Sequence, residues 1–234
     1  MIEKVLVFDI WGDYAHFRKI ETTTSPLTYS IPTGTSLLGL VSAIVGLERD
    51  SYYDLFSPEN TKYAIRILNP IKKVEINLSL IDTKKGLYLW DIKKNPRTLI
   101  PFEFLKEPKY RIYFWTSHLE IYKKLKGFLE KHQSFYTPYL GISELIANFK
   151  FVGELDDIEK CHGQGEIHTV IRKDKARLMI ETGKRYGLER IPLFMDSNRV
   201  VREYADVILE LNGKPLKVSD SEFYRIGSEN VIFI

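Results

Sequence analysis

Residues 5–46 read VLVFDIWGDYAHFRKIETTTSPLTYSIPTGTSLLGLVSAIVG and contain three successive patterns. An apolar run predicts a buried strand over residues 3–10. Residues 11–32 then form a long loop rich in aromatic, hydroxyl and basic side chains. A hydrophobic segment predicts a helix over residues 34–47, and this helix should be buried because almost every face of it is apolar. Loops as long as 11–32 are usually functional or disordered in compact domains, and the aromatic residues favour function.

The predicted helix begins just after Pro32, where Thr33 or Thr35 is a suitable N-cap. Its first turn offers free backbone N–H groups and the positive end of the helix dipole, which together suit a phosphate. Gly39, Ala43 and Gly46 lie on one face of this helix. Glycine costs about 1 kcal/mol in helix propensity. We therefore expect a packing reason for this face, namely close approach to a sheet.

The segments that follow alternate between strand and helix patterns. Strands are predicted within residues 62–92, broken at Asn69-Pro70 and at a hairpin turn Lys84-Lys85-Gly86, and at residues 110–115 and 149–152, with a helix at 118–131. Residues 93–109 form a basic, proline-punctuated excursion. This order is typical of an α+β, ferredoxin-like or RRM-like domain. One face of such a sheet is covered by helices, and we expect the other to be free for a ligand or partner.

Beyond residue 155 the pattern changes to short strands. Segments 167–172 and 177–182 flank Lys173-Asp174-Lys175 and predict a hairpin, and further strands are predicted at residues 192–195, 206–211 and 231–234. The chain is therefore expected to contain an α+β domain at residues 1–154, with the basic excursion inserted in it. A small β-rich region at residues 155–234 completes it.

Composition limits the classes of function. The net charge of +3 and the pI of about 8.7 are mildly basic, which is compatible with nucleic acid but does not require it. The single cysteine, Cys161, excludes an internal disulfide and a cysteine-based zinc cluster. The scattered histidines have no standard zinc spacing, so no metal site is expected. The N-terminus does not resemble a signal peptide and the longest apolar run is too short for a bilayer, so we expect a soluble cytoplasmic protein without membrane contact.

The loop after the first strand is the best candidate for nucleic-acid binding. It combines stacking faces and cations, and the helix start adds hydroxyls; the residues are Trp11, His16, Phe17, Arg18, Lys19, Thr33 and Thr35. Stacking on an aromatic side chain contributes about 1–3 kcal/mol per base. The alternative is that Trp11 and Phe17 belong to the core and that the cations are simply solvated. Further candidates are Lys93, Lys94 and Arg97 in the excursion, and Lys184 and Arg185 between two glycines, where a plain turn is the alternative.

Catalysis is a second hypothesis. A metal-independent endoribonuclease needs a base, an acid and a cation near the scissile phosphate. His16, next to Arg18 and Lys19, or His118, with tyrosines nearby in the sequence, are the candidates. The alternative is that each histidine caps a helix or lies on the surface. No nucleotide-binding glycine motif and no other cofactor signature is present, so no cofactor is expected.

The segments from Phe8 to Arg18, from Pro32 to Thr35 and from Leu38 to Leu40 resemble the start of the Cas-five family. This family comprises subunits of the RAMP superfamily in the type I CRISPR effector complex, Cascade, and the match is closest to the I-B branch. Residues 96–110 resemble the family's thumb hairpin. The resemblance therefore implies an RNA-binding domain at residues 1–154 with a β-hairpin thumb inserted at about residues 84–110. Residues 136–144, YTPYLGISE, resemble its Tyr-Leu-Gly-x-Ser-Glu signature.

The resemblance implies a non-catalytic subunit that binds and caps the 5′ handle of the CRISPR RNA (crRNA) in antiviral defence. It also implies contacts with the backbone subunit and the large subunit of Cascade. By position, residues 11–19 and 32–35 would face the handle and residues 93–97 would lie on the thumb. One branch of the family cuts repeat RNA itself with tyrosine, lysine and histidine. The stretch Trp115-Thr116-Ser117-His118 departs from that site because it has no lysine beside the histidine.

Overall fold

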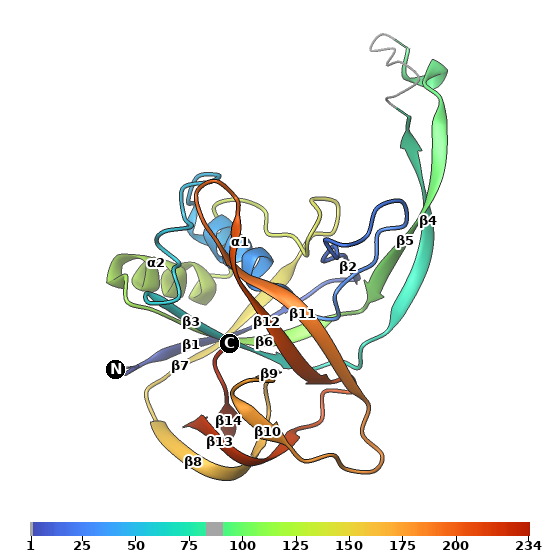
Figure 1. Cartoon of the computed structure of the whole chain (residues 1–234). Coiled ribbons are helices and arrows are strands. Elements are labelled where there is room, and N and C mark those ends of the chain that lie inside the picture. Colours follow the sequence, from blue (N-terminus) through green and yellow to red (C-terminus); the bar gives the residue numbers. More distant parts are fainter. Residues whose placement is uncertain (1, 83–90) are drawn as a thin grey trace.

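A computed structural model describes residues 2–82 and 91–234 of the chain. Its central sheet has four antiparallel strands in the order β3-β6-β1-β7. These strands are β1 (Val5–Trp11), β3 (Thr61–Ile67), β6 (Lys109–Thr116) and β7 (Asn148–Leu155), and the helices are α1 (Gly34–Val45) and α2 (Leu119–Glu130). Both helices lie on one side of this sheet (Figure 1). The mixed α+β fold is as predicted.

The remaining strands form a hairpin sheet and two C-terminal sheets. They are β2 (Tyr14–Ala15), β4 (Lys73–Ile81), β5 (Arg97–Lys106), β8 (Ile158–Ile167), β9 (Ile171–Arg172), β10 (Ala176–Leu178), β11 (Tyr186–Met195), β12 (Val201–Glu210), β13 (Leu216–Ile226) and β14 (Glu229–Val231). A short 3-10 turn, η2 (Ile92–Lys94), precedes β5. Among the described residues, no helix has the length and apolar character that crossing a membrane requires.

Alternation along β1 assigns its side chains to two cores. Leu6, Phe8 and Ile10 belong to the main core with the helices, whereas Val5 and Val7 belong to a separate cluster. This follows from the two-residue period of a strand. Every residue from Val5 to Ile10 is buried, so both faces of this strand are covered over that range.

The face opposite the helices, called here the second face, is covered by β13, β14 and the last residues of the chain. Val7 and Tyr113 of the central sheet pack with Ile226, Val231 and Phe233. The prediction that this face is free was therefore wrong over most of β1. The sequence pattern showed β1 as apolar on both faces but did not identify what would cover the second one.

Helix α1 begins at Gly34, directly after the N-cap candidate Thr33, and ends at Val45, two residues before the predicted end. Thr33 is the N-cap, and its hydroxyl accepts a hydrogen bond from the Ser36 backbone N–H at 3.2 Å. Gly46 is the C-cap with φ of +74°, a left-handed conformation that glycine adopts without steric cost. The face of small residues does not approach a sheet, in contrast to the prediction. Gly39 and Ala43 line an open pocket instead.

Strands β4 and β5 form the long hairpin that projects from the body of the molecule (Figure 1). Its strands begin at Lys73, well before the predicted excursion, and from Lys109 onward the chain already belongs to the central sheet. The predicted turn at Lys84-Lys85-Gly86 lies outside the described residues. We call residues 73–82 and 91–106 the thumb hairpin.

The C-terminal strands differ from the predicted hairpin at residues 167–182. β9 pairs with β12, whereas β10 pairs with β13, so the two short strands diverge into different sheets. The long strands β8 and β13 were not predicted. β8 has glycines at 163 and 165 and polar outward-facing residues, and β13 has a bulge between Val218 and Ser221 that interrupts its alternation.

Candidate nucleic-acid interface

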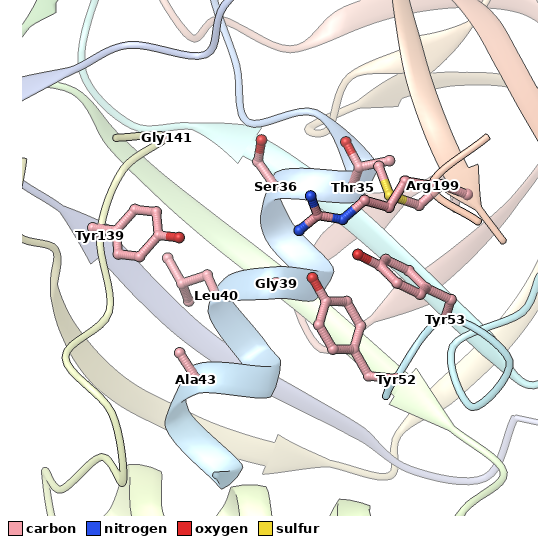
Figure 2. Close-up of a pocket in the computed structure, with 11 residues that line it drawn as sticks. Thr35, Ser36, Gly39, Leu40, Ala43, Tyr52, Tyr53, Tyr139, Gly141 and Arg199 are labelled. Carbon is pink, nitrogen blue, oxygen red and sulfur yellow. The ribbon is translucent and has the colours of Figure 1, made fainter. Parts of the chain in front are cut away.

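An open pocket of about 370 Å³ lies along the N-terminal half of α1 (Figure 2). Thr35, Ser36 and Gly39 of α1 line one side of it. Tyr52 and Tyr53 come from the segment after α1. The other contributors include Tyr139 and Gly141, which precede β7, and Met195 and Arg199, from the end of β11 and the turn before β12. Four separate segments therefore build this site, which we call the α1 pocket.

The basic group of the α1 pocket is Arg199. Figure 2 shows its guanidinium over the first turns of α1, with the tyrosine hydroxyls pointing toward the same space. Its Nε donates to Asp50 Oδ1 at 2.8 Å, and Asp50 also accepts from the Tyr53 hydroxyl at 2.6 Å. These hydrogen bonds, from Tyr53 and then Arg199, lower the pKa of Asp50. The Arg199 side chain is 51% exposed, so it is held in position but remains accessible to a ligand.

Gly39 of α1 keeps the pocket open in front of Tyr52. A Cβ on Gly39 would come within 3.2 Å of the Tyr52 hydroxyl, so a larger side chain would fill the space in front of this tyrosine. Burial raises the pKa of Tyr52 above its usual value, which keeps the hydroxyl protonated at neutral pH. The pocket therefore offers aromatic rings, neutral hydroxyls, a guanidinium and the N-terminal turn of α1, the groups that bind a phosphate and its base.

Gly141 connects this pocket to the loop after β1. It has φ of +98°, and a Cβ at this position would lie 2.0 Å from the carbonyl oxygen of His16. The His16 N–H in turn donates to the Leu140 carbonyl at 3.0 Å. The Tyr-Leu-Gly motif therefore has a packing role here, since only glycine allows the two backbones to approach so closely.

Two predicted RNA-binding residues are buried. His16 and Phe17 are 1% and 3% exposed, respectively, so the core alternative holds for Phe17, and His16 is neither at a helix cap nor on the surface. The His16 ring lies beside Phe102 and Phe104 of β5, and its Nδ1 hydrogen-bonds to the Glu103 carbonyl at 2.7 Å. Burial lowers the pKa of His16 more than this hydrogen bond raises it.

The other predicted RNA-binding residues among the first fifty positions lie at different places in the structure. Thr35 lines the α1 pocket, and the buried Thr33 holds the helix start. Arg18 is exposed and donates to the Thr22 carbonyl, whereas Lys19 lies 3.8 Å from a Glu189 carboxylate. Trp11 lies on the second face of the sheet, with the Lys109 ammonium 5.6 Å from its ring centre.

The predicted basic residues of the thumb lie far from the α1 pocket. Lys93 and Lys94 are in η2, and Arg97 is the first residue of β5; all three are exposed. Lys94 has an exposed ion pair with Asp91 at 3.4 Å. They are at the outer end of a ten-residue strand, which spans about 30 Å. No single nucleotide can contact both regions.

Lys184 and Arg185 lie in a turn at the beginning of β11. Lys184 is bound to the Glu181 carboxylate and donates to the Pro215 carbonyl at 2.7 Å. Gly183 has φ of +81° in this turn. Lys184 is thus already neutralised within the protein, whereas the exposed Arg185 has its backbone N–H bound to Glu210.

The two candidate catalytic histidines do not come together. His118 is the N-cap residue of α2 and follows the last residue of β6, whereas His16 contacts β5 close to where β6 begins. The eight residues of β6 between these places span roughly 25 Å. The His118 Nε2 is buried without a hydrogen-bond partner. Across residues 2–82 and 91–234, no cluster of three or more potential metal ligands is found.

Sequence reasoning missed Tyr52, Tyr53 and Arg199. None of them lies in a periodic or glycine-rich pattern, and Arg199 is nearly 150 positions from Asp50, its partner. Tyr139 falls within the stretch that resembles the family signature, although no role was predicted for it. The sequence signals for this site were that stretch and the capped start of α1, which the structure places at one end of the pocket.

Comparison with known proteins finds the same fold in solved structures. No curated protein matches the sequence. Among solved structures, a CRISPR protein from Archaeoglobus fulgidus is similar at 14% identity and a TM-score of 0.60, over 97% of each chain. A chain of a CRISPR RNA-guided surveillance complex is similar at 12% identity and a TM-score of 0.55, over 90% of this chain and 91% of that one.

At such low identity these structures support the fold alone, and the family follows from the sequence. The model of the family described as CRISPR-associated protein (Cas_Cas5) matches residues 5–208, which is most of the chain. The match includes β1, α1 and every segment that lines the α1 pocket. This chain therefore belongs to the CRISPR-associated Cas5 family.

Proposed function

We propose that this protein is a non-catalytic subunit of a type I CRISPR interference complex, of the I-B branch, and that it binds the 5′ handle of the crRNA. The observation that carries this proposal is the α1 pocket, where a capped helix N-terminus, Arg199 and three tyrosines surround one open space. Membership of the Cas5 family supports the CRISPR-associated role.

The chemistry of the pocket suits one unpaired nucleotide. A phosphate would be bound by Arg199 and by the first-turn amides of α1, because both carry positive charge toward the pocket. A base would stack on or lie against the tyrosine rings, and the Thr35 and Ser36 hydroxyls offer further donors and acceptors. Single-stranded RNA presents phosphates and unstacked bases in this combination.

The partners in this proposal are the backbone subunit and the large subunit of the complex. The structurally similar surveillance-complex chain supports assembly with other subunits. The thumb hairpin has exposed apolar side chains at Leu80, Ile81 and Leu99, of which Leu99 is 69% exposed. An isolated hairpin with such residues is the kind of surface that a neighbouring subunit covers.

The test is a binding assay with an RNA copy of the 3′ part of the host's own CRISPR repeat, in EDTA, on native and denaturing gels. We expect a salt-sensitive shift with intact RNA, which is weakened about tenfold by Arg199→Ala because a charge-assisted contact is lost. The slope of log affinity against log salt should fall by about one.

Arg202→Ala is the matched control. It removes an arginine of the neighbouring segment that is bound to Asp196 and does not line the pocket. Equal losses for the two variants would reject the site, and no RNA binding by the wild-type chain would reject the function. A discrete cut within the repeat would instead indicate the processing endoribonuclease.

A further inference from the structure

The open part of the second face lies at the end of β1. Trp11 shares this face with Val5, Val7 and Asp9, because all four are at alternate positions of the strand. The C-terminal strands cover Val5 and Val7, but Trp11 is not part of the cluster that they form and remains partly exposed. The α1 pocket is on the helix side of the same sheet, so the two places are separated by the sheet itself (Figure 1).

The neighbours of Trp11 on this face are basic or polar. Lys109 of β6 and Asn148 of β7 are directly opposite it in the two adjacent strands. Lys150 is two residues further along β7 than Asn148 and lies opposite Asp9, so it faces the same side of the sheet. Asn148 and Lys150 are exposed, and the Lys109 ammonium lies 5.6 Å from the indole centre. We call these four residues the Trp11 platform.

The charge of the platform is positive. Asp9, the nearest acid on the same face, is bound by Arg111 through contacts of 2.8 and 3.3 Å, and is 7% exposed. In contrast, neither Lys109 nor Lys150 has a carboxylate within 4 Å among the residues that the structure describes. Glu107, which lies nearby at the base of the thumb hairpin, is paired with Lys72 at 3.3 Å. Within residues 2–82 and 91–234, the two cations of the platform thus have no acidic partner.

We propose that the Trp11 platform binds a second unpaired nucleotide of the RNA, separate from the one in the α1 pocket. The base stacks on the indole, and Lys109 and Lys150 bind the flanking phosphates. Asn148 donates from its side-chain amide, whose oxygen already accepts from the Phe149 N–H at 2.8 Å. This inference rests on the proposed RNA binding. RNA is favoured over a protein partner because an aromatic face between two unpaired cations matches a base between two phosphates.

The test uses the intrinsic fluorescence of Trp11 in the full chain. Trp90→Phe and Trp115→Phe leave Trp11 as the only tryptophan, and this protein is titrated with the repeat RNA and with a twelve-nucleotide oligouridine. We expect quenching of Trp11 that saturates together with binding. Trp11→Ala should weaken binding about fivefold or more, since stacking contributes about 1–3 kcal/mol per base, and Trp11→Phe should restore most of it.

Lys150→Ala provides a variant that does not disturb packing, because its side chain is exposed. It should weaken binding and reduce the salt slope by about one while leaving the thermal midpoint unchanged. Lys124→Ala, on exposed α2 surface, is the matched control and should have no effect.

If RNA binds without quenching Trp11 fluorescence and Lys150→Ala keeps wild-type affinity, the platform proposal is rejected. The proposal for the α1 pocket is then unaffected. Loss of binding in Arg199→Ala alone, with no change in Trp11→Ala, would lead to the same conclusion. If the wild-type chain binds no RNA, both this inference and the proposed function fail.

Discussion

At the scale of single residues, Glu229 is a carboxylate at the second face that binds three side chains of the central sheet. It binds the guanidinium groups of Arg66 and Arg111 and accepts a hydrogen bond from the Tyr113 hydroxyl. Burial raises the pKa of Glu229, but the hydrogen bonds from Tyr113 and Arg66 and the nearby charges outweigh it, so its pKa lies below the usual value. Glu229 thereby joins β14 to the central sheet.

Glu229→Gln should lower the free energy of unfolding by about 2–4 kcal/mol at pH 7, because it leaves two partly buried arginines without their counter-charge. The lowered pKa means that the wild-type carboxylate stabilises the fold above the unfolded-state pKa of about 4.3. This contribution is lost as the pH falls through the folded-state pKa. Urea unfolding at pH 7 and pH 3 measures both effects.

The difference between Glu229→Gln and wild type should therefore shrink at pH 3. Glu222→Gln is the control, since its ion pair with Lys160 is exposed and should contribute less than about 1 kcal/mol. A difference between Glu229→Gln and wild type that stays constant across this range would show that the charge of Glu229 is not what stabilises the fold.

At the scale of elements, the thumb hairpin is anchored at its base by buried contacts. The His16 ring packs against Phe102 and Phe104, and Glu103 accepts hydrogen bonds from the Thr28 N–H at 3.1 Å and the Lys73 ammonium at 2.8 Å. These contacts tie the loop after β1 to both strands of the hairpin. His16 is therefore a structural residue of the thumb in this fold.

His16→Ala should loosen the thumb hairpin selectively. We expect the opening free energy of the β4 and β5 amides to fall by about 1–3 kcal/mol, whereas the amides of β1 and β6 keep their protection, because the lost contacts belong to the hairpin base. Hydrogen–deuterium exchange resolved by peptide measures this. His162→Ala, an exposed histidine on β8, is the control; equal changes throughout the molecule would argue against a local anchor.

At the scale of the whole molecule, the C-terminal strands pack against both sides of the central sheet. Strands β11 and β12 belong to the main core beside α1, whereas β13 and β14 cover the second face (Figure 1). The main core contains residues from both sides of residue 155, including Phe8 of β1 with Ile191 and Leu193 of β11. Phe233, close to the last residue, is buried with Val5 and Tyr113. The two predicted regions thus share their hydrophobic cores.

We expect the chain to unfold in one cooperative transition, because a shared core couples the two regions. Phe233→Ala should lower the unfolding free energy by about 3–5 kcal/mol and shift the whole transition, not a part of it. Calorimetry combined with circular dichroism and tryptophan fluorescence tests this prediction. Two separate transitions would instead indicate independent domains divided near residue 155.

The sequence by itself determined the local elements of this protein. The apolar run of β1, the Thr33 cap and the spacing of α2 depend on interactions within a few residues, and periodicity and capping report such interactions directly. The family resemblance likewise rested on a contiguous stretch, and the match over residues 5–208 agrees with it.

Only the tertiary structure decided which surface each side chain occupies. It buried His16 and Phe17, covered Val7 with strands more than 200 residues away, and brought Arg199 to the start of α1. It also turned Trp11 to the face opposite the pocket, away from the residues next to it in sequence. These outcomes depend on contacts between distant segments, and a single sequence has no local signal for such contacts.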